Sequence, residues 1–210
     1  MEYVELTYQL GYVIDDVPAP ILELIRSHCE KAEDLGMTYK GHLVGQIQSS
    51  WEVKFDDELV PLVDYLSTLA SEYETSTGKQ EAPVGTRKLF RHQDFWLNHQ
   101  RKTQFQPAHT HSADYSFVVW LKVPYDIEEE FNQDFVGQAR ESWAGCFSFL
   151  NPGPFSCAVN PTRLPVDRTY EGKIVLFPSK LTHIVYPFYT SDEVRVSFAG
   201  NLAEPVLVDY

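Results

Sequence analysis

Apolar residues recur at helical spacing in two segments near the start of the chain. In segment 19–36, APILELIRSHCEKAEDLG, they return every three or four residues, and Gly36 follows as a C-cap. In segment 57–78, DELVPLVDYLSTLASEYETSTG, leucines form a similar stripe, with Pro61 in the first turn and Gly78 at the end. The pattern therefore predicts two amphipathic helices.

From Lys88 onward the pattern changes to short runs rich in Val, Phe, Tyr and Trp. The runs are KLFRHQDFWLNHQ, YSFVVWLKV, CFSFL, GKIVLF, HIVYPFY and VRVSFAGNL. They predict an antiparallel β-sandwich or barrel in the C-terminal two thirds, with the helices packed outside it. We predict a loop for the Pro-rich segment 151–172. Since no linker or repeat divides the chain, we expect a single domain over 1–210, with helical support at about 1–85 and a β core at about 86–205.

Composition and charge narrow the classes of protein. The 210 residues include 30 acidic and 17 basic side chains, and the formal charge of −13 opposes binding to phosphates. No stretch reaches the ~18 apolar residues of a membrane span, and the first residues lack the basic and apolar regions of a signal peptide. The three cysteines show no C-x-x-C spacing, which argues against a disulfide framework or a zinc knuckle. We expect a cytoplasmic protein without nucleic-acid or membrane partners.

Three histidines stand where strands begin or end. His109 and His111 alternate onto one side of the chain directly before the run that starts at Tyr115, and His183 opens a later run. In a double-stranded β-helix, ligands on an early and a late strand converge at the barrel mouth. Because imidazole is a common metal ligand, the three residues are candidates for one metal site.

An arginine and a serine share one strand face further along the chain. Arg195 and Ser197 alternate in RVSFAGN, shortly after His183. An arginine inside a barrel is costly unless it meets an anion, and a guanidinium beside a hydroxyl suits a carboxylate. A metal site and an anion site together indicate a chelating carboxylate ligand.

The order of these motifs resembles that of a known family. The chain reads FWLNHQRKTQFQPAHTHSADYSFVVWLKVP, then GKIVLFPSKLTHIVYPF, then DEVRVSFAGNL. This is similar to a family of Fe(II)/2-oxoglutarate-dependent oxygenases from marine bacteria and viruses of cyanobacteria, distant relatives of prolyl 4-hydroxylases. Its members read W-x-N, H-x-H, F-P-S-x-L-x-H-x-V-x-P and R-I-S-I-S-F-N. The resemblance covers about Phe95 to Leu202.

The resemblance implies a mainly β fold, a double-stranded β-helix or jelly roll with flanking helices, that uses Fe(II), 2-oxoglutarate and O2. It implies a hydroxylase that couples oxidative decarboxylation of 2-oxoglutarate to C–H oxidation of an unknown small molecule or peptide. His109, His111 and His183 fall on the metal-ligand positions, with no further catalytic residue indicated. Arg195 and Ser197 fall on the positions that bind the distal carboxylate, and Asn98 on a cosubstrate hydrogen bond. If the protein is viral, we expect it in the cytoplasm of the host cell.

Alternatives remain open from the residues. The wider superfamily commonly carries H-x-D, so Asp114 is an alternative carboxylate ligand to His111. A cupin-like three-His dioxygenase or isomerase would not use 2-oxoglutarate, although a cupin would place a Glu near Ser116. A sandwich that has lost iron and only binds a ligand is a third class, against which the retention of Arg195 and the histidines argues. The oligomeric state is not indicated.

Overall fold

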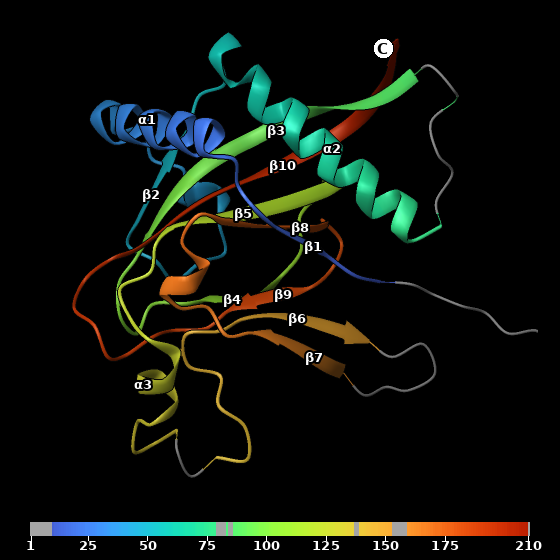
Figure 1. Ribbon diagram of the computed structural model, residues 1–210. Helices are drawn as coiled ribbons and strands as arrows, with labels where there is room; N and C mark the ends of the chain where they lie inside the picture. The colour runs from blue at the N-terminus through green and yellow to red at the C-terminus, as the bar shows by residue number, and fades with distance from the viewer. Residues whose placement is uncertain (1–9, 79–82, 84–85, 137–138, 153–158, 210) are drawn as a thin grey trace, which may run out of the picture.

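Two antiparallel sheets share one core in the computed structural model, which describes residues 10–78, 83, 86–136, 139–152 and 159–209 (Figure 1). The larger sheet has the strand order β1 (Val13–Asp16), β8 (Lys173–Pro178), β5 (Tyr115–Lys122), β10 (Arg195–Asp209), β3 (Thr86–Gln100) and β2 (Ser49–Glu52). The smaller sheet has the order β4 (Gln106–His109), β9 (His183–Val185), β6 (Phe147–Pro152) and β7 (Val159–Leu164). The predicted jelly roll with flanking helices is confirmed.

Two long helices pack against the larger sheet on the side away from the smaller sheet (Figure 1). Helix α1 (Ala19–Leu35) ends at Gly36, whose φ of 64° lies in the left-handed region that glycine tolerates best. Helix α2 (Val60–Ser76) has Pro61 in its first turn, as predicted. Short helical segments complete the fold: η1 (Lys40–His42), η2 (Asp57–Leu59), α3 (Ile127–Phe131) and η3 (Arg168–Tyr170). Among the described residues, no helix has the length and apolar character needed to cross a membrane.

Strand β5 is buried on both faces. Phe117 and Val119 belong to the core between sheet and helices, whereas Val118 and Trp120 belong to the core between the two sheets. Because alternate residues of a strand point to opposite faces, a strand covered on both sides reads as a continuous apolar run. This explains why YSFVVWLK shows no polar alternation.

The long ladder between β10 and β3 carries a row of polar residues on the face toward the smaller sheet. Its cross-strand pairs there are Arg195 with Gln100, Ser197 with Asn98, Ala199 with Trp96, and Asn201 with Asp94. Successive pairs are two residues apart and therefore about 7 Å apart along the strand. The ladder thus spaces different side chains along one wall between the sheets.

Three short strands were not expected from the sequence pattern. β1 and β2 lie in the N-terminal part that we predicted to be helical support, and they form the two edges of the larger sheet. The Pro-rich segment also differs from the predicted loop, because it contributes the end of β6 and all of β7, which pair with each other. Residues 153–158, including Cys157, lie outside the described residues.

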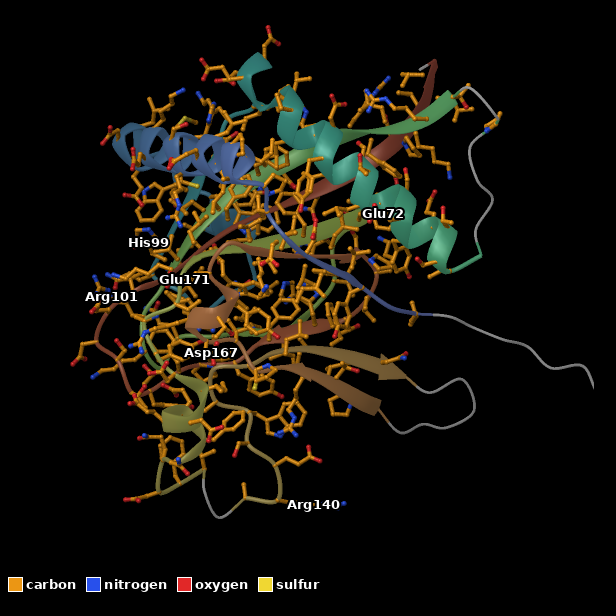
Figure 2. All side chains as sticks on the ribbon, viewed as in Figure 1. Glu72, His99, Arg101, Arg140, Asp167 and Glu171 are labelled. Atoms are coloured by element: carbon orange, nitrogen blue, oxygen red, sulfur yellow. The ribbon has the colours of Figure 1, made fainter. Side chains whose placement is uncertain are left out.

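Acidic side chains fix the connection that follows β7. Asp167 accepts a hydrogen bond from the Thr169 N–H at 2.9 Å and so caps η3, and Glu171 accepts one from the Val123 N–H at 2.7 Å (Figure 2). These bonds satisfy backbone donors that would otherwise lack a partner. The segment between β7 and β8 is thereby joined to the end of β5.

Gly200 marks a close approach of strands in the larger sheet. A Cβ at this position would lie 2.7 Å from the Asp94 carbonyl oxygen and 2.9 Å from the Phe117 ring. Gly200→Ala is therefore expected to lower the free energy of unfolding by about 1–3 kcal/mol, the usual cost of overpacking a core. The measurement is the urea unfolding midpoint. Gly41→Ala is the matched control, because its Cβ would meet nothing within 4 Å; equal midpoints for the two variants would contradict the close approach.

Candidate metal centre

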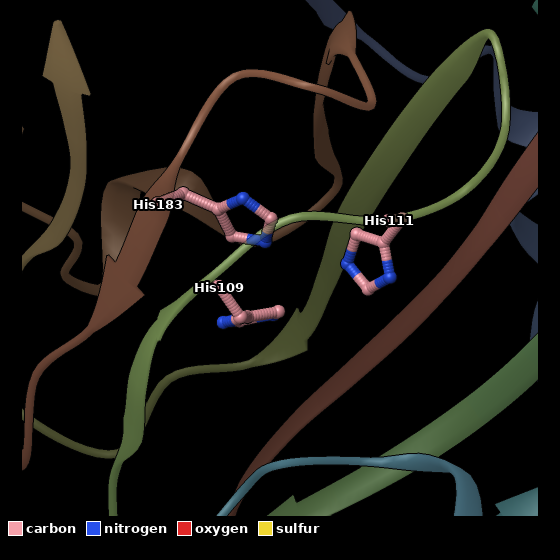
Figure 3. A group of neighbouring side chains, drawn as sticks. All are labelled: His109, His111 and His183. Atoms are coloured by element: carbon pink, nitrogen blue, oxygen red, sulfur yellow. The ribbon is translucent and has the colours of Figure 1, made fainter. Parts of the chain in front are cut away.

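Three histidine rings converge between the two sheets, as Figure 3 shows. His109 ends β4 and His183 begins β9, and the two residues are directly opposite each other in the β4–β9 ladder. His111 follows two residues later, on the connection to β5. One ring nitrogen from each histidine lies within 4.8 Å of the others. The predicted convergence of the three residues is therefore present in the structure.

Backbone carbonyls orient two of the three rings. The Nδ1 atom of His109 is 2.7 Å from the Pro107 carbonyl oxygen, and the Nδ1 atom of His183 is 3.0 Å from the Leu181 carbonyl oxygen. Because a carbonyl only accepts hydrogen bonds, each Nδ1 carries the hydrogen and each Nε2 keeps a free lone pair. This is the arrangement that commonly fixes metal-ligating histidines.

Burial keeps the three imidazoles neutral. It lowers the pKa of His109, lowers that of His111 to about 4, and lowers that of His183 well below the usual value. Each neighbouring histidine would also repel a second positive charge in the group. Three neutral rings with one nitrogen each within 4.8 Å of the others form a set of donors suited to a divalent transition metal such as Fe(II).

The backbone of His111 is held by the turn that follows β8. Its N–H donates to the Ser179 carbonyl at 2.9 Å, and its own carbonyl accepts from Lys180 Nζ at 3.1 Å. Asp114 faces elsewhere: its carboxylate accepts a hydrogen bond from the Glu204 N–H at 2.9 Å, and it does not belong to the histidine group. The structure therefore brings His111, rather than the alternative carboxylate, to His109 and His183.

Arg195 is buried at the far end of the same cavity. Its guanidinium donates to the Tyr125 hydroxyl at 2.6 Å, to the Gly145 carbonyl at 3.3 Å and to Oε1 of Gln100. Within the described part of the chain, no carboxylate lies within ion-pair distance of it. A buried guanidinium with only neutral partners retains its full positive charge, so this end of the cavity suits an anion.

Two further predicted residues line the cavity between Arg195 and the histidines. Ser197 and Asn98 are opposite each other in the β10–β3 ladder, and both border the cavity. The Oδ1 atom of Asn98 and the Nε1 atom of Trp96 are buried without a hydrogen-bond partner among the described residues. Buried polar groups are rarely left unpaired, so these two atoms indicate a ligand with polar atoms at this level of the cavity.

Sequence reasoning missed Gln100 and Tyr125, which contact the Arg195 guanidinium. Gln100 is the cross-strand neighbour of Arg195, whereas Tyr125 lies 70 residues away in the chain. For Gln100, its place two residues after Asn98 was an available signal, because it puts both side chains on one strand face. No comparable pattern marks Tyr125.

Two of the remaining described histidines, His99 and His28, serve other contacts. His99 pairs with Glu33 at 2.8 Å on the outer side of the fold (Figure 2). His28 lies 3.2 Å from the carboxylate of Asp56, close to Glu58, where it ties α1 to the start of α2. Neither group borders the cavity that holds His109, His111 and His183.

Comparisons with known proteins agree with this fold. Residues 94–201 match the model of a family described as "Putative 2OG-Fe(II) oxygenase". A Pseudomonas putida prolyl-4-hydroxylase superposes with a TM-score of 0.57 at 13% identity, covering 93% of both chains. The carbocyclase SnoK from nogalamycin biosynthesis gives a TM-score of 0.55 at 15% identity, covering 95% of this chain and 80% of the other. A Trichoplax adhaerens prolyl hydroxylase gives 0.51 at 11% identity, covering 92% and 83%. No curated protein sequence matches significantly.

The jelly roll with its internal histidine group fits a metal-dependent enzyme. Because the family model spans more than half of the chain, the protein belongs to the 2OG-Fe(II) oxygenases. It accordingly uses Fe(II), 2-oxoglutarate and O2. This assignment favours the oxygenase over the cupin-like and non-enzymatic alternatives.

Proposed function

We propose that the protein is a hydroxylase in which His109, His111 and His183 bind Fe(II). Arg195, Ser197 and Asn98 bind 2-oxoglutarate in the same proposal, and the substrate is a small molecule or a peptide. The observation that carries the proposal is one cavity lined by three neutral imidazoles, two of them oriented by backbone carbonyls, and by an arginine without an anionic partner among the described residues. A 2OG-Fe(II) oxygenase needs a metal site and an anion site that are separated by no more than the length of one 2-oxoglutarate molecule.

Arg195 would bind the 5-carboxylate of 2-oxoglutarate. Its neutral partners Gln100 and Tyr125 hold the guanidinium without cancelling its charge, and the neighbouring Ser197 offers a hydroxyl donor. The Asn98 amide would hydrogen-bond the cosubstrate nearer the metal. The distal carboxylate and the chelating end of the cosubstrate would thus be fixed at two levels of the β10–β3 ladder.

The three-histidine set leaves the charge of the metal to be balanced by a ligand that does not come from the protein. Three neutral imidazoles supply no negative charge, so protein ligands leave the charge of Fe(II) unbalanced. The 1-carboxylate of 2-oxoglutarate would supply that charge. His183 also lies against the rings of Phe147 and Phe177, with centroids at 5.5 and 4.8 Å, so apolar rings cover its side of the donor set.

With iron and cosubstrate bound, the centre would use O2 to convert 2-oxoglutarate to succinate and CO2. One oxygen atom enters succinate, and the other enters a C–H bond of the substrate to give an alcohol. The role of the protein is to hold the cosubstrate and the substrate in a fixed orientation and to shield the site from solvent. The Trichoplax adhaerens structure contains a peptide fragment, which supports a peptide as one of the two proposed substrate classes.

The proposal is tested by titrating 2-oxoglutarate into the anaerobic Fe(II)-loaded protein. A visible charge-transfer band that saturates at one equivalent is the expected result. On admission of O2, succinate should form in proportion to consumed 2-oxoglutarate, and a true substrate should gain one oxygen atom by mass spectrometry. An iron-loaded protein without the band would contradict cosubstrate binding, and a product that gains no oxygen would contradict hydroxylation.

A further inference from the structure

A second, polar hollow of about 360 Å³ adjoins the metal cavity. Trp96 and His111 line both spaces, so whatever occupies the hollow lies beside the histidine group. The other side chains that matter here are Asp94 and Lys180, which border the hollow together with the hydroxyl-bearing Ser112. The hollow is large enough for a small metabolite and lies next to the reacting centre.

The hollow is on the opposite side of the metal cavity from Arg195. Along the inner face of β3, Gln100 is beside Arg195, Trp96 borders both spaces, and Asp94 reaches only the hollow. Asp94 and Gln100 are six residues apart in one strand, which corresponds to about 20 Å. The proposed cosubstrate site therefore does not extend into the hollow, which is left for the substrate.

Asp94 is held in place by neutral donors. Its two carboxylate oxygens accept hydrogen bonds from the Tyr39 hydroxyl at 2.7 Å and from Nδ2 of Asn201 at 2.6 Å. The Tyr39 ring is stacked between Trp96, at 5.3 Å and 10°, and His42, at 4.9 Å and 25°. Within the described residues, no basic side chain lies within ion-pair distance of Asp94. Its negative charge is therefore fixed in position and uncompensated.

Lys180 supplies the opposite charge on the same hollow. Its Nζ donates one hydrogen bond, to the His111 carbonyl at 3.1 Å, and an ammonium group has three hydrogens to donate. No described carboxylate lies within ion-pair distance of it. Among the described lysines, Lys31, Lys102, Lys122 and Lys173 are paired with carboxylates, whereas Lys180, like Lys40 and Lys54, is not. The hollow thus presents one unpaired anion and one unpaired cation.

We infer that the hollow binds the substrate as a free α-amino acid, with its ammonium group on Asp94 and its carboxylate on Lys180. The inference rests on the proposed function, because it takes the adjoining histidines to be the iron site. A residue inside a peptide chain carries neither of the two charges, so it would leave both Asp94 and Lys180 unpaired. The amino-acid side chain would extend past Trp96 toward the metal.

Calorimetry on the iron-free protein measures ligand binding to the hollow without any contribution from the metal. The probes are the twenty proteinogenic L-amino acids, followed by the N-acetyl and the C-amide derivatives of the amino acid that binds best. At least one free amino acid should bind, and removing either charge should weaken binding about ten-fold or more, as expected for a partly exposed charge pair. In the anaerobic Fe(II)/2-oxoglutarate protein, the same amino acid should perturb the charge-transfer band.

Two variants assign each charge to its partner. Asp94→Asn should weaken binding of the free amino acid about ten-fold but change little for its N-acetyl derivative, since the interacting ammonium is already gone. Lys180→Met should behave in the same way toward the C-amide derivative. The matched controls are Asp16→Asn and Lys173→Met, which change the same charges in an ion pair outside the hollow.

The outcomes separate this inference from the proposed function. The amino-acid assignment is overturned if none of the twenty amino acids binds, or if the free and blocked forms bind equally well. This holds whether or not the charge-transfer band appears in the iron-loaded protein. Tighter binding of a doubly blocked tripeptide would identify an internal peptide residue instead. A missing charge-transfer band in the iron-loaded protein contradicts the proposed function, while the calorimetry still decides what the hollow binds.

Discussion

Replacing His183 with alanine is expected to abolish stoichiometric Fe(II) binding. His183 is the most deeply buried member of the histidine group and the cross-strand partner of His109, so its loss leaves two ligands at neighbouring positions of one chain segment. Losing a residue that only supports a ligand commonly costs 10–100-fold in metal affinity, and we expect at least about 100-fold for the ligand itself. Metal analysis after gel filtration and the anaerobic charge-transfer band both measure this.

His99→Ala is the control for the loss of a histidine. The His99 ring pairs with Glu33 outside the cavity, so this variant should retain iron and the band. Urea unfolding of both iron-free variants shows whether the fold persists. A folded His183→Ala protein with one equivalent of iron would remove His183 from the metal site.

The second large effect concerns Arg195. Arg195→Ala is expected to weaken 2-oxoglutarate binding at least about thirty-fold, because breaking one buried charge pair costs on the order of 2–5 kcal/mol. Iron content should be unchanged, since the guanidinium contacts Gln100, Tyr125 and Gly145 rather than the histidines. Titration of the charge-transfer band with 2-oxoglutarate gives both affinities.

Gln100→Glu tests the same anion site without removing the arginine. A glutamate of nearly the same shape would place a carboxylate directly against the Arg195 guanidinium, where it would compete with the 5-carboxylate of 2-oxoglutarate. We expect a comparable loss of affinity in a folded protein. Arg168→Ala is the control, because Arg168 pairs with Asp126 at the surface. Unchanged 2-oxoglutarate affinity in both Arg195→Ala and Gln100→Glu would place the cosubstrate elsewhere.

The sequence predicted the parts of the fold that have strong periodicity. The helical stripe ending at Gly36 and the apolar run of β5 each produced an element close to its predicted range. β1 and β2 were missed because each has four residues and is stabilised mainly by pairing with a distant strand. β7 was missed because its Pro161 and the prolines around it favour a loop, although an edge strand tolerates proline.

The candidate site was predictable where residue type and local spacing coincide. His109 and His111 share a face by their spacing, and Arg195 and Ser197 do the same. The contacts of Arg195 with Tyr125 and of Asp94 with Tyr39 were not predictable, because they join residues that are 70 and 55 positions apart. Tyr125 and Tyr39 lie on connections outside the strands, and no local pattern encodes where such segments pack.

The alternation of faces along β10 limits how this cavity can change during evolution. Insertion or deletion of one residue between Arg195 and Asn201 would turn every following side chain to the opposite face of the sheet. A point substitution has no such effect, because it changes one cross-strand pair of the β10–β3 ladder and leaves the neighbouring pairs in place. A change of residue type at the Asn201 end can therefore alter that part of the wall without disturbing the Arg195 end, whereas a change in the length of β10 before that residue cannot.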